Sequence, residues 1–228
     1  ASPCIKISND GVDRRIVRMV DMVVLFVHGM GRSPMSGWPM LHHLRRGGLK
    51  ATSFGYMTSM ESFHSIQSRL VERIVAVAAT GHYIVVGHSL GGVLLRAALN
   101  SLPATAIRPH HIFLLGSPVH PSRLAQRLKN NILYRALAGD CGQMLASPER
   151  MNEVGALNEA TTSIVGIRGI AATRSLFGEE PNDGVVAVSE ASAQWITDQC
   201  QVPVVHTLLP SSRCVAEIIR EKLIVDEG

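Results

Sequence analysis

The sequence predicts an α/β protein in which a mostly parallel central sheet is covered by helices on both faces. Short apolar segments rich in β-branched residues alternate along the chain with longer segments whose apolar residues recur at helical spacing. Turns that contain glycine separate the two kinds of segment. Because a helix is the usual crossover between two parallel strands, this alternation favours a parallel sheet with right-handed connections.

Composition indicates a single domain that spans residues 1–228. Of the 228 residues, 46% are hydrophobic, which is enough for one substantial core. The chain shows no break in composition and no linker rich in proline or serine. No apolar run approaches the ~20 residues that a helix needs to span a bilayer.

The first half of the chain contains three expected strands, at 22–27, 49–55 and 82–86. Segment 22–27 is continuously apolar, as a strand with both faces covered should be. Residues 38–46 predict a helix that two glycines stop, and residues 62–79 predict a long amphipathic helix. The apolar face of this second helix consists of Phe63, Ile66, Leu70, Ile74 and Val77.

The second half continues the alternation, with expected strands at 111–115, 163–167 and 202–209. We expect a helix over 92–99 and a terminal helix over 213–225.

Two further segments do not follow the simple alternation. Residues 121–161 have an interrupted helical pattern and are longer than a simple crossover, so we interpret them as a small helical cap insertion. Near the N-terminus, segments 5–7 and 16–20 are expected to form an antiparallel pair of strands.

The pentapeptide Gly87-His88-Ser89-Leu90-Gly91 has the pattern G-x-S-x-G and lies between an expected strand and an expected helix. A strand, a tight turn flanked by glycines and a helix form a nucleophile elbow, which exposes a serine hydroxyl at the sheet edge. Ser89 is therefore expected to adopt a strained backbone conformation. The side chain of His88 is expected to point inward and to form a hydrogen bond beneath the turn.

A serine hydroxyl needs a general base, which follows the serine and an acidic residue in chain order at such a site. His110 and His111 begin a strand at the end far from Ser89, and His120 opens the helical insertion. His206 lies late in the last expected strand, from which a loop could bring it over Ser89. We therefore predict that His206 is the base.

The base needs an orienting carboxylate, and we predict that Asp183 supplies it. Asp183 lies in a polar loop and precedes a glycine, which suits a tight turn that presents its side chain. Glu179 and Glu180, in the same loop, are the alternatives. Asp140 lies inside the insertion and Asp198 is expected in a later helix or loop, so both are less suitable.

Two backbone N–H groups are needed to stabilise the oxyanion that forms when the serine attacks a carbonyl. One is expected from Leu90, which directly follows the nucleophile. The other is expected from Met30, in the glycine-containing loop after the first apolar strand. In the same loop, His28 and Gly29 are predicted to lie against the substrate, because glycines let the backbone approach it.

These motifs resemble those of the α/β-hydrolase superfamily, and most of all those of the small bacterial lipases and carboxylesterases with an H-G-x-G loop. The matching segments occur in the family's order at 28–31, 87–92, 182–186 and 205–207. The resemblance implies a Ser-His-Asp hydrolase that works through an acyl-enzyme and without a cofactor. It also implies that Ser117 lines the substrate pocket.

We therefore predict that the chain hydrolyses carboxylic esters of small molecules or lipids. A thioesterase, an amidase or an acyltransferase would use the same residues, and a non-catalytic protein that binds a small molecule is the alternative outside this class. In the insertion, an apolar stripe with basic neighbours would cover the acyl pocket and open in transient contact with a lipid surface. The stripe consists of Leu124, Leu128 and Ile132. The short insertion favours short-to-medium acyl chains.

Charge and cysteine usage exclude other classes of function. The net charge is +4, but the basic residues are dispersed and only three tyrosines and two tryptophans accompany them, so we expect no nucleic-acid partner. The four cysteines form no C-x-x-C pair and the histidine-rich segments lack nearby ligands, so we expect no metal site. We expect a cytoplasmic protein, while a secreted form whose signal has been removed stays open.

Overall fold

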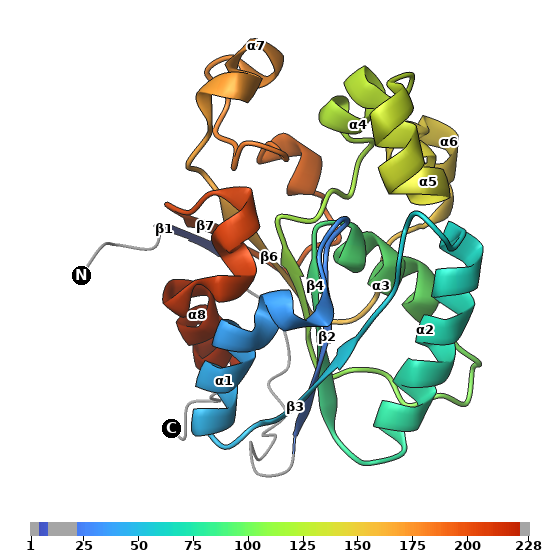
Figure 1. The fold of residues 1–228 in the computed structure, drawn as a ribbon. Helices are drawn as coiled ribbons and strands as arrows, with labels where there is room; N and C mark the ends of the chain where they lie inside the picture. The colour runs from blue at the N-terminus through green and yellow to red at the C-terminus, as the bar shows by residue number, and fades with distance from the viewer. Residues whose placement is uncertain (1–4, 9–21, 224–228) are drawn as a thin grey trace.

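A seven-stranded sheet runs through the centre of the computed structural model, which describes residues 5–8 and 22–223 (Figure 1). Six strands are parallel, and β1 runs antiparallel to β7 at one edge. The predicted α/β class with a mostly parallel sheet is confirmed. From edge to edge the strands are β3 (Lys50–Phe54), β2 (Val23–Val27), β4 (Tyr83–His88), β5 (Ile112–Leu115), β6 (Thr161–Gly166), β7 (Asp198–Val202) and β1 (Ile5–Ser8).

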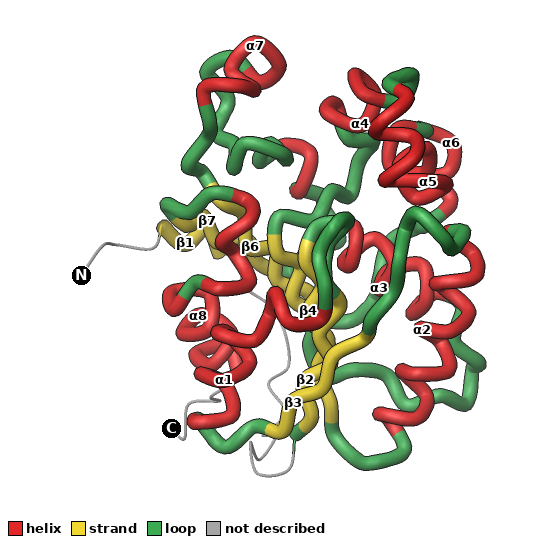
Figure 2. Tube along the Cα trace, viewed as in Figure 1, coloured by secondary structure: helices red, strands yellow, loops and turns green. Residues whose placement is uncertain are grey.

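Helices cover both faces of the sheet, as predicted (Figure 2). One layer contains α1 (Trp38–Arg46) and α8 (Arg213–Leu223), which share a core cluster with one face. The other layer contains α2 (Phe63–Ala78) and α3 (Leu90–Asn100). The remaining short elements are α7 (Arg174–Phe177) and the 3₁₀ helices Pro34–Gly37, Ala171–Thr173, Ser189–Ala191 and His206–Ser211.

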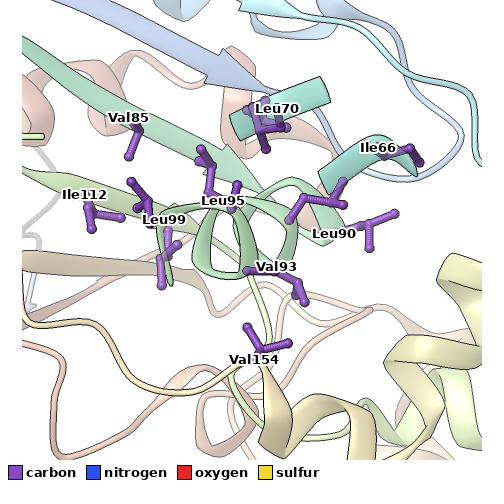
Figure 3. Close-up of a cluster of buried hydrophobic side chains, with 14 of the residues drawn as sticks. Ile66, Leu70, Val85, Leu90, Val93, Leu95, Leu99, Ile112 and Val154 are labelled. Atoms are coloured by element: carbon purple, nitrogen blue, oxygen red, sulfur yellow. The ribbon is translucent and has the colours of Figure 1, made fainter. Parts of the chain in front are cut away.

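The larger core cluster surrounds α3, the helix that follows Ser89 (Figure 3). Every residue of α3 except its last is buried, and all of β4 is buried. A helix that is apolar on all sides has to lie inside the protein, because it has no polar face to turn toward water. The strand and the helix on either side of Ser89 are therefore firmly packed.

Three helices form the segment between β5 and β6, namely α4 (Arg123–Leu128), α5 (Ile132–Ala146) and α6 (Pro148–Glu153). They lie beyond the carboxyl ends of the strands (Figure 1). Two hydrogen bonds tie the segment to the chain after β3, from Thr58 Oγ1 to Leu137 O at 2.8 Å and from Phe63 N to Asp140 Oδ2 at 2.9 Å. The middle of the insertion is therefore fixed to the chain that follows β3.

The prediction of a strand at 202–209 is wrong, because the last strand is Asp198–Val202 and a 3₁₀ helix begins at His206. Pro203 ends the strand, since proline has no N–H to donate to a neighbouring strand. The apolar residues beyond it pack into the core from a turn instead, as buried Leu209 does.

The sequence did not predict β7, because three of its five residues are polar. Its buried positions are Cys200 and Val202, and the other three are only half-buried. Asp198, which was expected in a helix or loop, is the first residue of this strand.

The N-terminal expectation is wrong in part. Residues 5–7 do lie in a strand, β1, but this strand pairs with β7. The segment 16–20, which was expected to be its partner, lies outside the described residues.

His111 gives the fold a measurable pH dependence. Burial, with Lys222 nearby, lowers the pKa of His111 from 6.5 to about 4. The unfolded chain therefore takes up a proton between pH 6.5 and about 4 that the folded chain refuses, so stability is lost as the pH falls through this window. His111→Gln keeps a polar group near Thr162 but does not titrate. In urea unfolding, the free energy of unfolding that is lost between pH 6.5 and pH 4 should be smaller by about 3 kcal/mol in His111→Gln than in wild type.

The matched control is His64→Gln, which replaces an exposed histidine on α2. Its unfolding free energy should follow the wild-type pH profile. If His111→Gln also followed that profile, the imidazole of His111 would not be the group that titrates.

Candidate active site

Ser89 sits in a strained turn between β4 and α3. Its φ of 53° and ψ of −124° make it the one described residue other than glycine with a positive φ. Such strain persists only where the surroundings enforce it, and it is concentrated at functional sites. The Ser89 N–H donates to Leu115 O at 2.9 Å, which fixes the turn against β5. The residue is partly exposed.

Close backbone packing holds this turn against the loop that follows β2. A Cβ atom at Gly91 would lie 2.3 Å from the carbonyl oxygen of Val27, so no side chain fits there. A Cβ atom at Gly29 would lie 3.1 Å from the Cβ of Ser89. The loop 28–31 therefore adjoins Ser89, where the sequence predicted it.

His206 and Asp183 form a buried pair. His206 Nδ1 lies 2.7 Å from Asp183 Oδ2, and the His206 N–H donates to the Asp183 carbonyl at 2.9 Å. Only 6% of His206 and 1% of Asp183 is exposed. When Nδ1–H donates to the carboxylate, the lone pair of Nε2 is left to accept a proton.

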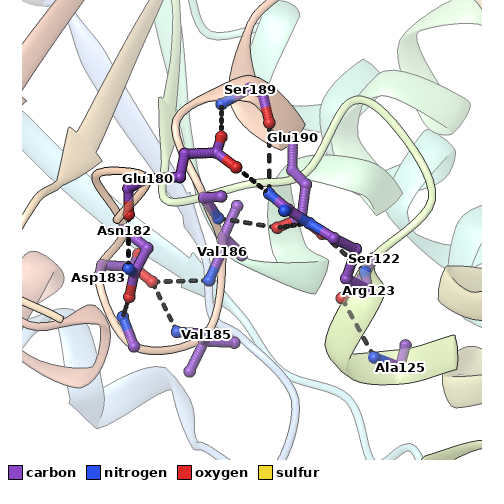
Figure 4. A network of polar contacts seen from close by, with 12 residues as sticks. Ser122, Arg123, Ala125, Glu180, Asn182, Asp183, Val185, Val186, Ser189 and Glu190 are labelled. Atoms are coloured by element: carbon purple, nitrogen blue, oxygen red, sulfur yellow. Dashed lines mark hydrogen bonds and ion pairs between the residues drawn. The ribbon is translucent and has the colours of Figure 1, made fainter. Parts of the chain in front are cut away.

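The second oxygen of Asp183 is held by the backbone of its own loop. Asp183 Oδ1 accepts hydrogen bonds from Val185 N at 2.9 Å and Val186 N at 2.7 Å (Figure 4). Gly184 N donates to the side chain of Asn182 in the same turn. The carboxylate therefore has one oxygen fixed by N–H donors and the other directed at His206.

Gly116 connects the His206–Asp183 pair with Ser89. A Cβ atom at Gly116 would lie 2.7 Å from Asp183 Oδ2 and 3.0 Å from His206 Nδ1, and Gly116 directly follows the residue that accepts the Ser89 N–H. The structure therefore brings Ser89, Asp183 and His206 together at the carboxyl ends of the parallel strands. The Ser89 hydroxyl itself makes no hydrogen bond within the described residues.

His88 points inward from the turn, as expected, and donates from Nε2 to the carbonyl oxygen of His206 at 3.1 Å. The two imidazole rings are 4.8 Å apart. Burial, with the proximity of the His206 ring as a smaller cause, lowers the pKa of His88 well below its usual value. His88 is therefore neutral and serves to hold the segment that carries His206.

The other carboxylates weighed as the acid have different partners. Glu180 pairs with Arg123 at 2.7 Å, and Glu179 is almost fully exposed. Asp140 pairs with Arg150, and Asp198 pairs with Lys222. Within the described residues, the carboxylate in contact with the His206 ring is that of Asp183.

A second polar network ties the Asp183 loop to the insertion, and sequence reasoning missed it. Buried Glu190 accepts hydrogen bonds from Ala187 N at 2.8 Å and from Arg123 N at 2.7 Å (Figure 4). The Arg123 guanidinium reaches Glu180 as well. Burial raises the pKa of Glu190, and the hydrogen bonds and the Arg123 charge oppose this shift. No local pattern signals a contact between residues so far apart in the chain.

The predicted oxyanion donors lie on either side of the strained turn. Leu90 begins α3, and Met30 lies in the loop after β2. Neither backbone N–H makes a hydrogen bond within the described residues. An oxyanion would therefore meet no competing acceptor for either group within those residues.

Two of the residues predicted to contact the substrate have buried side chains. Ser117 is fully buried, and its Oγ would lie 2.3 Å from a Cβ atom at Gly92, so it packs beneath α3 and does not line an open surface. The side chain of His28 is 1% exposed and stacks on Tyr56. Leu128, at the end of α4, is half-buried.

Neither a metal centre nor a membrane-spanning helix is present among the described residues. No group of three or more potential metal ligands occurs among them. None of the described helices has the length and apolar character needed to cross a bilayer.

Known proteins resemble this chain in structure and not in sequence. No family model matches the sequence, and no curated protein matches it. The mature form of the Bacillus licheniformis lipase BlEst2 matches with a TM-score of 0.73 at 16% identity, over 97% of this chain and 98% of that one. The metagenomic carboxyl esterase MGS0156 matches with a TM-score of 0.65 at 14% identity, over 88% of this chain and 68% of that one.

A third match is the thioesterase RedJ from the prodiginine biosynthetic pathway of Streptomyces coelicolor. Its TM-score is 0.58 at 15% identity, over 93% of this chain and 96% of that one. Likeness at such identities concerns the fold and leaves the substrate open. Together with the parallel sheet and the strained turn after β4, these matches show that the chain has the α/β-hydrolase fold.

Proposed function

We propose that this chain is a serine hydrolase that cleaves carboxylic esters through an acyl-enzyme on Ser89. The observation that carries the proposal is the buried His206–Asp183 pair next to the strained serine turn. A neutral imidazole held by a carboxylate is the base that a serine hydroxyl needs at neutral pH. The lipase and esterase among the structural matches support the same chemistry.

The reaction follows from the groups present. The Ser89 hydroxyl attacks the ester carbonyl while His206 Nε2 takes its proton, and Asp183 stabilises the imidazolium. The N–H groups of Met30 and Leu90 bind the oxyanion. His206 then returns the proton to the leaving alcohol, which leaves an acyl group on Ser89. Water, activated by His206, releases the acid and restores the serine.

The function is tested with Ser89→Ala. This change removes the nucleophile and leaves the packing unchanged, so the protein should fold and lose nearly all hydrolysis of p-nitrophenyl esters, because the three residues act as a unit. Wild type, and not the variant, should be labelled by a fluorophosphonate. The matched control is Ser68→Ala, at an exposed position on α2, which should keep full activity.

Thioester and amide substrates belong in the same assay. A higher kcat/KM for acyl thioesters than for oxygen esters would make the chain a thioesterase, the activity named for RedJ. Substantial ester hydrolysis by folded Ser89→Ala would exclude the mechanism. No labelling and no turnover by wild type would favour a non-catalytic binding protein.

The proposal extends to the acyl group, which we place under the insertion against Leu128. Leu128 is half-buried and lies outside the main core clusters, so its side chain is available to an acyl chain. Each methylene buried against it contributes about 0.8 kcal/mol, or roughly fourfold in kcat/KM. The short insertion fits short-to-medium chains.

Leu128→Asp should therefore flatten the rise of kcat/KM with acyl length across a series of p-nitrophenyl esters. The control is Ile107→Asp, an exposed apolar position near the amino end of the sheet, which should keep the wild-type profile. Loss of stability without a change of profile in the folded fraction would assign Leu128 to the core.

We also place lipid contact on the first two turns of α5. Ile132, Leu133 and Leu137 are each at least 70% exposed, and the hydrogen bond from Thr58 to Leu137 brings the exposed loop after β3 beside them. That loop adds exposed Met57 and Met60. Exposed basic residues, Arg127, Lys129 and Arg135, flank the apolar group. Apolar side chains with basic neighbours favour an anionic lipid surface.

The double variant Leu133→Asp, Leu137→Asp should bind phosphatidylglycerol vesicles about tenfold or more weakly in co-sedimentation. Its hydrolysis of a soluble short-chain ester should be unchanged. Val75→Asp, at an exposed apolar position on α2, is the control and should bind like wild type. Equal binding by the double variant would remove lipid contact from this surface.

A further inference from the structure

The side chain of His28 has contacts that sequence reasoning did not anticipate. It was expected to face the substrate, but its ring lies beneath the loop, with its centroid 4.2 Å from that of Tyr56 and the two planes 4° apart. Burial lowers the pKa of His28 below its usual value, so the ring is neutral near pH 7. A neutral imidazole has one donor nitrogen and one acceptor nitrogen.

The contacts of the two ring nitrogens define a single tautomer. His28 Nδ1 lies 2.8 Å from Gly29 O, and a carbonyl oxygen only accepts, so Nδ1 carries the proton. Tyr56 N lies 3.4 Å from His28 Nε2, and a backbone N–H only donates, so Nε2 accepts. The ring therefore acts as a fixed donor toward the carbonyl of Gly29.

That carbonyl belongs to the same peptide unit as the N–H of Met30. A trans peptide is planar, and its C=O and N–H groups point in opposite directions. Gly29 O also accepts a hydrogen bond from Arg32 N at 3.3 Å. With the carbonyl held toward His28, the Met30 N–H points away from the ring, and it makes no hydrogen bond within the described residues.

The preceding peptide is fixed independently. The Tyr56 hydroxyl donates to the carbonyl oxygen of His28 at 2.7 Å. Burial raises the pKa of Tyr56 well above its usual value, so the phenol keeps the proton that it donates. Gly29, whose lack of a side chain lets it lie against His88 and Ser89, is thus held between two oriented peptide units.

We propose that His28 is a positioning residue that orients the Gly29–Met30 peptide, so that the Met30 N–H is preset to receive the oxyanion. The inference rests on the proposed function of Ser89. A donor that is already oriented costs no reorganisation when negative charge develops, and losing one such donor lowers kcat on the order of a hundredfold. A rotated peptide would present a carbonyl oxygen in place of the N–H and would repel the oxyanion.

Three substitutions at one position separate this role from packing. In His28→Asn the side-chain amide can donate from nearly the position of Nδ1, so Gly29 O keeps its donor. In His28→Gln the amide reaches the position of Nε2 and leaves Gly29 O without that donor. His28→Leu fills the space without any donor.

Steady-state kinetics of ester hydrolysis should rank the variants. We expect His28→Leu and His28→Gln to lose on the order of a hundredfold in kcat with KM changed by less than about threefold, because the lost interaction is made in the transition state. His28→Asn should stay within about tenfold of wild type. Thermal unfolding reports the packing effect of each change separately.

The ranking decides the proposal. Wild-type kcat in folded His28→Leu, or equal losses in the Asn and Gln variants, would overturn it, because either result would mean that the donor to Gly29 O is irrelevant. If His28→Leu does not fold, the comparison of Asn with Gln still decides. A wild-type chain without Ser89-dependent hydrolysis would overturn the proposed function and this inference with it. Ser89-dependent hydrolysis with a contradictory ranking of the variants would overturn this inference alone.

Discussion

The close approach of the first turn of α3 to the carbonyl groups that end β2 is the constraint on which the rest of the site depends. At Gly91 the two backbones are so near that even a methyl group would overlap the Val27 oxygen. The packed helix and strand on either side cannot relax, because both are almost wholly buried. Ser89 is therefore kept at a positive φ that it would leave if free. The same contact sets the loop that contains Met30 beside the helix start at Leu90.

The remaining parts of the site come from distant segments that meet at the carboxyl ends of the parallel strands. His206 is bound to Asp183 through both its ring and its backbone N–H, so the two residues move as one unit. His88 joins that unit to the serine turn from below. The Arg123 network joins the same loop to the insertion, so the segment proposed to contact the acyl group and the segment with the carboxylate are mechanically connected.

The sequence was sufficient where local chemistry controls local structure. Glycines around Ser89 and an apolar strand before it predict the turn, because few other conformations suit that pattern. Prediction failed where the outcome depends on neighbours. The polar strand β7 is stabilised by pairing on both sides, which its own residues do not reveal. Ser117 and His28 carry polar side chains in the right segments, but packing under α3 and against Tyr56 decides where those side chains point.

A crystal structure of the protein after reaction with an alkyl phosphonate tests the central claim most directly, because the adduct imitates the tetrahedral intermediate. Phosphorus should be bonded to Ser89 Oγ, with the phosphoryl oxygen about 2.7–3.1 Å from the backbone nitrogens of Met30 and Leu90. His206 Nε2 should lie within hydrogen-bonding distance of Ser89 Oγ. A phosphoryl oxygen directed to solvent or held by other groups, or phosphorus on a different residue, would contradict the account.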